Sequence, residues 1–196
     1  MILYGASGHA EVVLDILVNL GIAVDVIFDD QPKCDLLFNV KVQNAPEKVD
    51  FHKAIISIGN NTFRKKISER FQLDYQTAIH PDSTVSQFSQ IGEGTVVMAK
   101  AVINPGSRVG KHCIVNTGAI VEHDCVVGDF AHISPNAALA GNVTVGEGSH
   151  IGIGASVIQG VKIGKWATIG AGAVIIKDVP DFATVVGNPG KIIKTN

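Results

Sequence analysis

The chain has 196 residues, a formal net charge of −2 and a pI near 6.4, so it is long enough for one large or two small domains, and we expect no nucleic-acid partner. The mean hydropathy is high at +0.28, yet residues 12–28, the most apolar window, contain Asp15, Asn19 and Asp25, so we expect no membrane insertion. The sequence does not open with a charged and apolar leader, and we expect a cytoplasmic protein.

The first 78 residues alternate between predicted strands and helices. In chain order these elements are a strand at 1–4, a helix at 11–20, a strand at 23–28, a strand at 54–58 and a helix at 62–71. The residues between the second and third strands show no regular pattern. The most basic stretch, Phe63-Arg64-Lys65-Lys66, is expected to lie on a solvated helix face. This alternation predicts a small parallel sheet flanked by helices, and we expect a Rossmann-like domain over residues 1–78.

A six-residue repeat begins at Ile79 and continues to Ile175. All seventeen positions spaced by six are Val, Ile or Leu, and the residue four places after each is Ser, Thr, Ala, Cys or Val. No helix and no hairpin ladder keeps that period, whereas a parallel β-helix does, with three hexapeptides in each coil of 18 residues. We expect a parallel β-helix of between five and six coils over residues 79–179, packed rigidly against the first domain, and a C-terminal tail over residues 180–196.

Two residue types have characteristic places in the repeat. Glycine recurs directly after the apolar position, as at Gly92 and Gly110, where we expect it to relieve a tight bend. Cys113 and Cys125 occupy the small inward position and are expected to be buried filler rather than nucleophiles. The odd number of cysteines argues against a disulfide framework.

Three loops of the first domain carry residues suited to a ligand: residues 5–9, Asp29–Asp30 and residues 59–61. Ligands bind beyond the carboxyl ends of parallel strands, and the helix that starts near His9 offers amide donors and a positive dipole end. Asp29 lies 21 residues after Gly8, where an acid can accept a hydrogen bond from a ribose hydroxyl. A mononucleotide or nucleotide sugar fits this small domain better than NAD. A tight turn beside two solvated acids is the alternative.

A second candidate site is centred on His123, which follows an apolar position by two residues and is predicted to point outward from a turn. Imidazole can accept a proton from an amine or a hydroxyl near neutral pH. Asp124 or Glu122 can fix its tautomer. A surface histidine between two acids is the alternative interpretation.

The repeat also places the histidines relative to one another. His132 and His150 are 18 residues apart and should stack on one face, whereas His123 is nine residues from His132 and should lie on a different side. The two cannot share a site within one chain, so we expect a cyclic oligomer with a site formed by His123 of one chain and His132 of its neighbour. The same spacing keeps three histidine nitrogens from meeting, and we expect no Zn²⁺ site.

The repeat, the segment from Glu122 to Gly128 and Gly187-Asn188-Pro189 resemble the hexapeptide-repeat acyltransferases. The segments 4–9, 28–30 and 58–61 narrow this resemblance to the UDP-N-acetylbacillosamine N-acetyltransferases and the related sialic-acid-type sugar O-acetyltransferases. The resemblance implies a left-handed β-helix, a homotrimer, and acetyl-CoA as the co-substrate, lying along the groove between two β-helices.

The resemblance also implies roles for individual residues. His123 falls on the family's general base and Asp124 on its supporting acid, and Asn116 matches a polar position near the active site. The residues implied to bind a UDP-linked sugar are Ser7, Gly8, His9, Asp29, Asp30, Gly59 and Asn60. Those implied to bind acetyl-CoA are His132, Gly141, Ile153 and Ala171.

The expected reaction is direct transfer of an acetyl group to the 4-amino group of a UDP-4-amino-4,6-dideoxy sugar. His123 removes the proton, and either His132 or a backbone amide near Gly141 stabilises the oxyanion. Three alternatives stay open: an O-acetyltransferase acting on a sialic acid or another glycan, a β-helix zinc carbonic anhydrase, and a non-catalytic nucleotide-sugar-binding protein.

Overall fold

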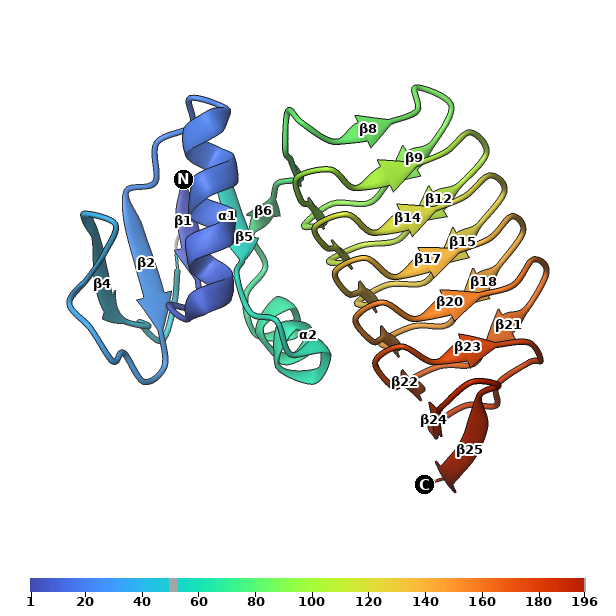
Figure 1. Cartoon of the computed structure of the whole chain (residues 1–196). Coiled ribbons are helices and arrows are strands. Elements are labelled where there is room, and N and C mark those ends of the chain that lie inside the picture. Colours follow the sequence, from blue (N-terminus) through green and yellow to red (C-terminus); the bar gives the residue numbers. More distant parts are fainter. Residues whose placement is uncertain (50–52, 196) are drawn as a thin grey trace.

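The protein is described by a computed structural model that covers residues 1–49 and 53–195 and consists of two parts side by side (Figure 1). An α/β part comes first, and a stack of short parallel strands follows it. The predicted fold class, an α/β domain followed by a parallel β-helix, is therefore confirmed. The sheet of the first part ends at Tyr75, and the first strand of the β-helix begins at Ala78.

The α/β part is built around one sheet with the strand order β3-β4-β2-β1-β5-β6. Strand β1 pairs in parallel with both β2 and β5, so the carboxyl ends of these three strands share one edge. The elements are β1 (Ile2–Tyr4), α1 (Gly8–Asn19), β2 (Val26–Asp29), β3 (Leu36–Leu37), β4 (Val40–Asn44), β5 (Lys53–Ile56), α2 (Asn61–Arg70) and β6 (Asp74–Tyr75).

A hairpin occupies part of the stretch in which the sequence showed no pattern. Strands β3 and β4 pair antiparallel around Phe38 and Asn39, whose φ angles are 44° and 67°. Two consecutive residues with positive φ match the tight hairpin turn that twists in the same sense as its strands. The sequence did not predict this turn because it lacks the Asn-Gly or Asp-Gly pair that usually marks it.

The β-helix has three sheets, and each strand pairs with the strand one coil away. The facing sheet, which lies against the α/β part, contains β7 (Ala78–Ile79), β10 (Val96–Val97), β13 (Ile114–Val115), β16 (His132–Ile133), β19 (His150–Ile151), β22 (Thr168–Ile169), β24 (Ala183–Val186) and β25 (Lys191–Thr195). The second sheet contains β8 (Thr84–Val85), β11 (Val102–Ile103), β14 (Ile120–Val121), β17 (Ala138–Leu139), β20 (Ser156–Val157) and β23 (Val174–Ile175). The third sheet contains β9 (Gln90–Ile91), β12 (Arg108–Val109), β15 (Val126–Val127), β18 (Thr144–Val145) and β21 (Lys162–Ile163).

The repeated apolar residues form the core of the β-helix. The second residue of each two-residue strand faces inward, and from Val97 onward these side chains are at most 3% exposed. Cys113 and Cys125 are fully buried beside them, which confirms the prediction that these side chains fill the core. The chain leaves the six-residue period after Ile175. Strand β24 nevertheless pairs in parallel with β22, and β25 then turns back antiparallel to it.

The role predicted for the glycines of the repeat needs a correction. From Ile91 to Ile169 the left-handed backbone conformation falls three residues after each apolar position, for example at His112 and Asp124, with φ of 51° and 60°. Gly92 and Gly110 directly follow the apolar position and do not have positive φ. A Cβ on Gly92 would lie 2.6 Å from the backbone of Gly110, so glycine there permits coils to approach closely rather than relieving a bend.

The two parts are joined by Arg64, which was predicted to lie on a solvated face but is only 1% exposed. Its guanidinium donates to the carbonyls of His112 at 2.7 Å and Phe130 at 2.8 Å in the β-helix, and to Asn61 Oδ1 at 2.8 Å in its own helix. It also donates to the carbonyls of Ile58 and Gly59. The prediction failed because the spacing within α2 does not reveal that this face docks on the β-helix. Burial lowers the pKa of Arg64 to about 10.

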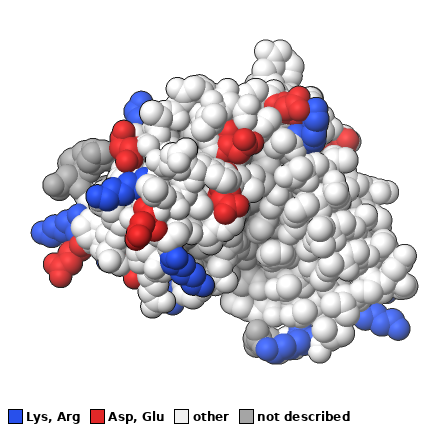
Figure 2. Space-filling view, turned by 60° about the vertical axis from the view of Figure 1, so that its left-hand side comes forward, with Lys and Arg blue, Asp and Glu red and all other residues white. Residues whose placement is uncertain are grey.

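Charges on the surface are mixed in sign. Figure 2 shows one face of the molecule, on which Lys and Arg lie among Asp and Glu instead of gathering into a patch of one sign. Several are paired, including Lys100 with Asp82 at 2.6 Å and Lys111 with Glu93 at 2.8 Å.

Candidate active site

The three predicted ligand loops meet at the carboxyl edge of the α/β sheet. Asp29, at the end of β2, accepts hydrogen bonds from the amides of Ala6 and Gln31, each at 2.8 Å. These bonds tie the loop after β1 to the loop after β2. Asp29 therefore shapes the edge through its own carboxylate, and each oxygen keeps a further lone pair for a ligand.

The start of helix α1 forms the middle of this edge. Ser7 is the N-cap residue, and its side chain makes no capping hydrogen bond. No atom lies within 4 Å of the position a Cβ would take on Gly8, so the backbone there is open to a ligand. His9 packs beside Gly59, and burial, with a smaller effect of Arg64, lowers the pKa of His9 to about 4. His9 is thus a neutral imidazole at pH 7.

Asp30 is held by residues that the sequence did not single out. Tyr4 Oη donates to Asp30 Oδ1 at 2.7 Å, and Arg70 Nη1 donates to the same oxygen at 2.9 Å. The hydrogen bond from Tyr4, followed by that from Arg70, lowers the pKa of Asp30. Asp30 is therefore a fixed carboxylate that closes one end of the edge.

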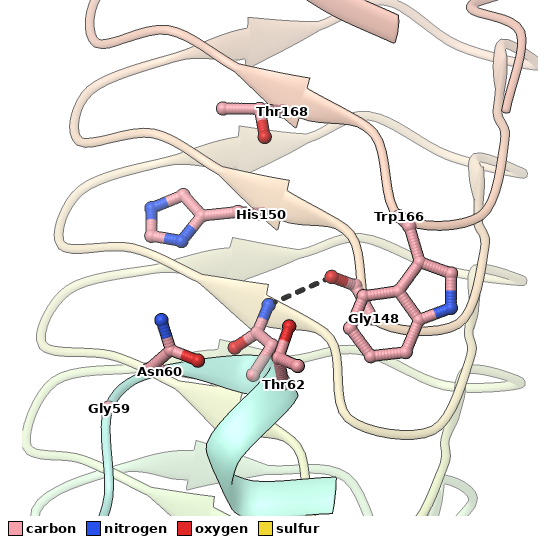
Figure 3. A pocket seen from close by; sticks show the side chains of 8 residues that line it. Gly59, Asn60, Thr62, Gly148, His150, Trp166 and Thr168 are labelled. Atoms are coloured by element: carbon pink, nitrogen blue, oxygen red, sulfur yellow. Dashed lines mark hydrogen bonds between the residues drawn. The ribbon is translucent and has the colours of Figure 1, made fainter. Parts of the chain in front are cut away.

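A cavity of about 410 Å³ opens between the start of α2 and the facing sheet (Figure 3). Gly59, Asn60, Asn61 and Thr62 line it from the α/β part, and Gly148, His150, Trp166 and Thr168 line it from the β-helix. Asn61 is not free to contact a ligand, because its Nδ2 donates to the carbonyl of Gly148 at 3.0 Å and its Oδ1 accepts from Arg64. The dashed line in Figure 3 marks the bond to Gly148.

His132 and His150 stack as the repeat predicted. They are paired in register on the facing sheet, and their ring centroids are 4.8 Å apart. Asn116 Nδ2 lies 3.0 Å from His132 Nε2, which joins two residues that the sequence had placed near the active site. His132 is only 9% exposed, and burial followed by the charge on His150 lowers its pKa to about 3. It is therefore a neutral side chain with little surface left for a ligand.

His123 lies elsewhere, on the connection between β14 in the second sheet and β15 in the third. Its Nδ1 is 2.9 Å from Asp124 Oδ2, and its side chain is 61% exposed. The Asp124 hydrogen bond raises the pKa of His123. Glu122 instead accepts from the backbone amide of His123 at 3.1 Å, so Asp124 is the acid that orients the ring. With Nδ1 donating to Asp124, Nε2 is free to accept a proton.

Gly141 lies beside the His123 ring, one coil further along the β-helix. A Cβ on Gly141 would lie 2.6 Å from both Cε1 and Nε2 of His123, so only glycine leaves room for the ring in this position. Within the described residues the amide of Gly141 donates no hydrogen bond. A backbone donor and a free imidazole nitrogen are therefore neighbours.

The other residues implied to bind acetyl-CoA lie on a third part of the surface. Ile153 and Ala171 are exposed and follow β19 and β22, on the connections from the facing sheet to the second sheet. The structure thus brings His123, Asp124 and Gly141 together, and separates them from Ile153 and Ala171. Over residues 1–49 and 53–195 no group of three or more His, Cys, Asp or Glu is arranged to hold a metal ion. In the same ranges no helix is long and apolar enough to cross a membrane.

Comparison with known proteins places this arrangement in a family. Residues 1–71 match the family of the PglD N-terminal domain, and residues 142–177 match the bacterial transferase hexapeptide family (six repeats). The structure of PerB from Caulobacter crescentus, in complex with CoA and GDP-perosamine, is 37% identical, covers 98% of this chain and 96% of its own, and superposes with a TM-score of 0.93. The chain belongs to the hexapeptide-repeat sugar acetyltransferases.

Two other members of this family are similar over different lengths. The acetyltransferase domain of PglB from Neisseria gonorrhoeae FA1090 is 39% identical, with 98% of both chains covered and a TM-score of 0.89, and it has also been solved in complex with acetyl coenzyme A. The UDP-N-acetylbacillosamine N-acetyltransferase of Bacillus subtilis (strain 168) is 49% identical over 47 residues, which span 22% of this chain and 22% of that protein. The resemblance inferred from the sequence is confirmed.

Some residues of this sugar acetyltransferase were missed by the sequence analysis. Trp166 and Thr168 line the cavity, and Arg64 positions the helix whose start forms the opposite wall. The 18-residue spacing offered a signal for Thr168, which follows His150 by one coil on the facing sheet. No comparable signal existed for Arg64.

Proposed function

We propose that the protein transfers the acetyl group of acetyl-CoA to the 4-amino group of a UDP-4-amino-4,6-dideoxy sugar. The observation that carries this proposal is the exposed His123–Asp124 pair, with Nδ1 and Oδ2 2.9 Å apart, beside the backbone of Gly141. The relatives support the two ligand classes, because PerB was solved with CoA and a nucleotide sugar. The Bacillus relative, named for a UDP-linked sugar, supports the choice of nucleotide.

In the proposed mechanism His123 acts as the general base. Its Nε2 takes a proton from the sugar amine as the amine nitrogen attacks the thioester carbonyl, and collapse of the tetrahedral intermediate releases CoA as the thiol. We favour the amide of Gly141 over His132 as the oxyanion donor, because this amide adjoins His123 and donates no hydrogen bond within the described residues, whereas His132 is only 9% exposed. Cys113 and Cys125 are buried, which supports direct transfer without an acyl-enzyme.

The nucleotide sugar is proposed to bind at the edge formed by Ser7, Gly8, His9, Asp29, Asp30, Gly59 and Asn60. This edge adjoins the facing sheet, whereas His123 leaves the β-helix between the second and third sheets. One chain therefore does not bring its own base to its own nucleotide sugar. We propose a homotrimer in which His123 of one subunit serves the nucleotide edge of its neighbour, with acetyl-CoA along Ile153 and Ala171 in the groove between β-helices.

Mixed oligomers test both the site and its location. Alone, the His123→Ala variant lacks the base and the Asp29→Ala variant lacks an intact nucleotide edge. The two variants are co-expressed with different tags, and oligomers that carry both tags are purified. A shared site restores activity at about a third of the sites, because each mixed trimer has one junction that joins an intact base with an intact edge. A site within one chain gives no recovery, and that result contradicts the trimeric arrangement.

The acceptor is tested with a panel. The wild-type protein is incubated with acetyl-CoA and UDP-linked or GDP-linked amino sugars, sialic acid, or no acceptor, and thiol release is followed. Release with a UDP-4-amino sugar is the expected result. Release only with sialic acid indicates O-acetylation. If no acceptor gives thiol release and acetyl-CoA also fails to raise the thermal stability of the protein, the protein is a nucleotide-sugar-binding protein and the proposal is wrong.

A further inference from the structure

Four histidine side chains gather at the junction between the α/β part and the β-helix. His9 lies in the first turn of α1, His112 lies between β12 and β13, and His132 and His150 lie on the facing sheet. His112 and His132 are buried, and the other two are partly buried. All four are close enough to the buried guanidinium of Arg64 for its positive charge to act on them. We call these four residues the histidine cluster.

Both parts of the molecule contact the histidine cluster. The His112 ring, from the β-helix, meets the Tyr75 ring of β6 edge-on, with the ring centroids 4.5 Å apart. His132, also from the β-helix, interacts with His9 of the α/β part. Within the described residues, His9 Nε2, His112 Nδ1 and His132 Nδ1 are buried without a hydrogen-bond partner. A protonated imidazole donates from both nitrogens, so a second proton on any of these three rings would leave a buried donor without an acceptor.

The charged groups around the histidine cluster do little to stabilise added protons. Glu93 and Asp129 are the two carboxylates that act on His112, and both already have partners. Glu93 pairs with the Lys111 ammonium at 2.8 Å, and Asp129 accepts from the Lys111 backbone amide at 2.8 Å. Within the described residues no carboxylate acts on the other three histidines. The phenol of Tyr75 is neutral, because burial raises its pKa to about 12.

Burial is the largest effect on the pKa of every histidine in the cluster. It lowers the pKa of His9 and of His112 to about 4 and that of His132 to about 3, and it also lowers the pKa of His150. An exposed histidine titrates near pH 6.5, so each ring is neutral in the closed junction and binds a proton below that pH once it is released. The closed junction is therefore favoured above pH 6.5, and this advantage is lost as the pH falls towards 4.

A separate apolar contact holds α1 on the first coils of the β-helix. Residues of α1 share one core cluster with four residues of the facing sheet and its flanks: Ala78, Val96, Met98 and Ile114. None of these side chains titrates. The hydrogen bonds of Arg64 in α2, by contrast, go to the carbonyls of His112 and Phe130, beside the histidine cluster. Acid thus acts on the contact of α2 with the β-helix and spares that of α1.

We propose that the contact between α2 and the β-helix is a pH-sensitive switch, which opens when the histidine cluster takes up protons while α1 stays in place and the β-helix stays folded. At pH 6 each released imidazole multiplies the opening equilibrium constant by about 4. His9, His112 and His132 together therefore raise this constant about 50-fold between pH 7.5 and pH 6. Because His9 packs beside Gly59, opening also loosens the nucleotide edge. That consequence rests on the proposed function, whereas the switch itself does not.

Two probes separate opening of this contact from unfolding. The full-length wild-type protein is titrated with urea at pH 7.5 and pH 6.0. The emission of Trp166, the single tryptophan, reports on α2, because the Lys65 ammonium of α2 lies 5.6 Å from its ring. Far-UV circular dichroism does not respond to opening, because every helix and strand is kept. We expect the equilibrium constant of the Trp166 transition to rise about 50-fold at pH 6.0, and this transition to precede the one seen by circular dichroism. No rise, or coincident transitions at pH 6.0, overturns the proposal.

Two variants test the histidines themselves. His112→Phe keeps an aromatic ring that cannot bind a proton, and Phe130, one coil later, has the same left-handed backbone, with φ of 60°. Its pH dependence should be about fourfold smaller than that of the wild type. His9→Gln should show the same reduction from the α/β side. His80→Gln is the control, because His80 Nδ1 accepts from the amide of Asp82 at 2.9 Å in the first coil, outside the cluster. A full pH dependence in both cluster variants, or a reduced one in the control, contradicts the proposal.

Discussion

Replacing Arg64 by Met should loosen the docking of α2 on the β-helix. Met keeps the length of the side chain and removes the guanidinium, which now donates to five oxygen atoms. The carbonyl of His112 and Oδ1 of Asn61 are buried and would lose their partner without access to water. The carbonyls of Ile58, Gly59 and Phe130 are only partly buried, and water can replace the arginine there.

The expected loss follows from these two groups of acceptors. Each buried acceptor left without a partner costs about 1–3 kcal/mol, so the two together cost about 4 kcal/mol. Removing a charge that the fold buries at a cost offsets part of this loss. We therefore expect the free energy of unfolding to fall by about 3 kcal/mol, equivalent to roughly 6–12 °C in Tm for a chain of this length.

Tryptophan fluorescence is a suitable assay, because Trp166 is the single tryptophan and the Lys65 ammonium of α2 lies 5.6 Å from its ring. Urea unfolding is followed by this signal and, in parallel, by circular dichroism. Lys66→Met is the control, since Lys66 is exposed on the same helix. If Arg64→Met unfolds within about 1 kcal/mol of Lys66→Met, the arginine does not stabilise the junction and the reasoning is wrong.

Four further predictions concern the proposed site. His123→Ala should lower turnover by about 10²- to 10⁴-fold, as for loss of a general base, and near-normal turnover would refute this role. Asp124→Asn should move the acidic limb of kcat/KM to lower pH, because Asp124 raises the pKa of His123 and the base must be unprotonated; an unmoved limb would show that another group titrates. Asp29→Ala should raise KM for the nucleotide sugar more than KM for acetyl-CoA, and the reverse order would place the nucleotide elsewhere. Gly141→Ala keeps the backbone amide but displaces the His123 ring, so kcat should fall while KM for acetyl-CoA and the unfolding midpoint hold; a change in KM alone would indicate a contact with acetyl-CoA instead.

The β-helix could be predicted almost residue by residue because its period leaves few choices. An inward residue must be apolar at every sixth position, so the sequence itself reports which side chains stack. The pairing of His132 with His150 and the separate place of His123 followed from counting alone. The hydrogen bond between His123 and Asp124 joins neighbours in sequence and was likewise foreseeable.

The junction between the two parts could not be predicted in this way. Arg64 contacts residues 48 and 66 positions away, and neither α2 nor the repeat carries a periodic signal for that contact. An arginine next to two lysines is usually solvated, and only the docked structure reveals carbonyls positioned to receive it. Trp166 was overlooked for the same reason, because its role depends on the helix opposite and not on its own repeat.

The in-register pairing of coils restricts how this protein can change in length. From β7 to β20, each strand of the β-helix pairs with the strand 18 positions further on, as β16 at His132 does with β19 at His150. A deletion of six residues after His123 would shift every later side chain to a neighbouring sheet and carry His132 away from the α/β domain. A whole coil is therefore the smallest insertion or deletion that leaves every later residue on its own face. Such a change would still alter which outward residues lie opposite α2, so homologues that differ by a coil need not recognise the same ligand.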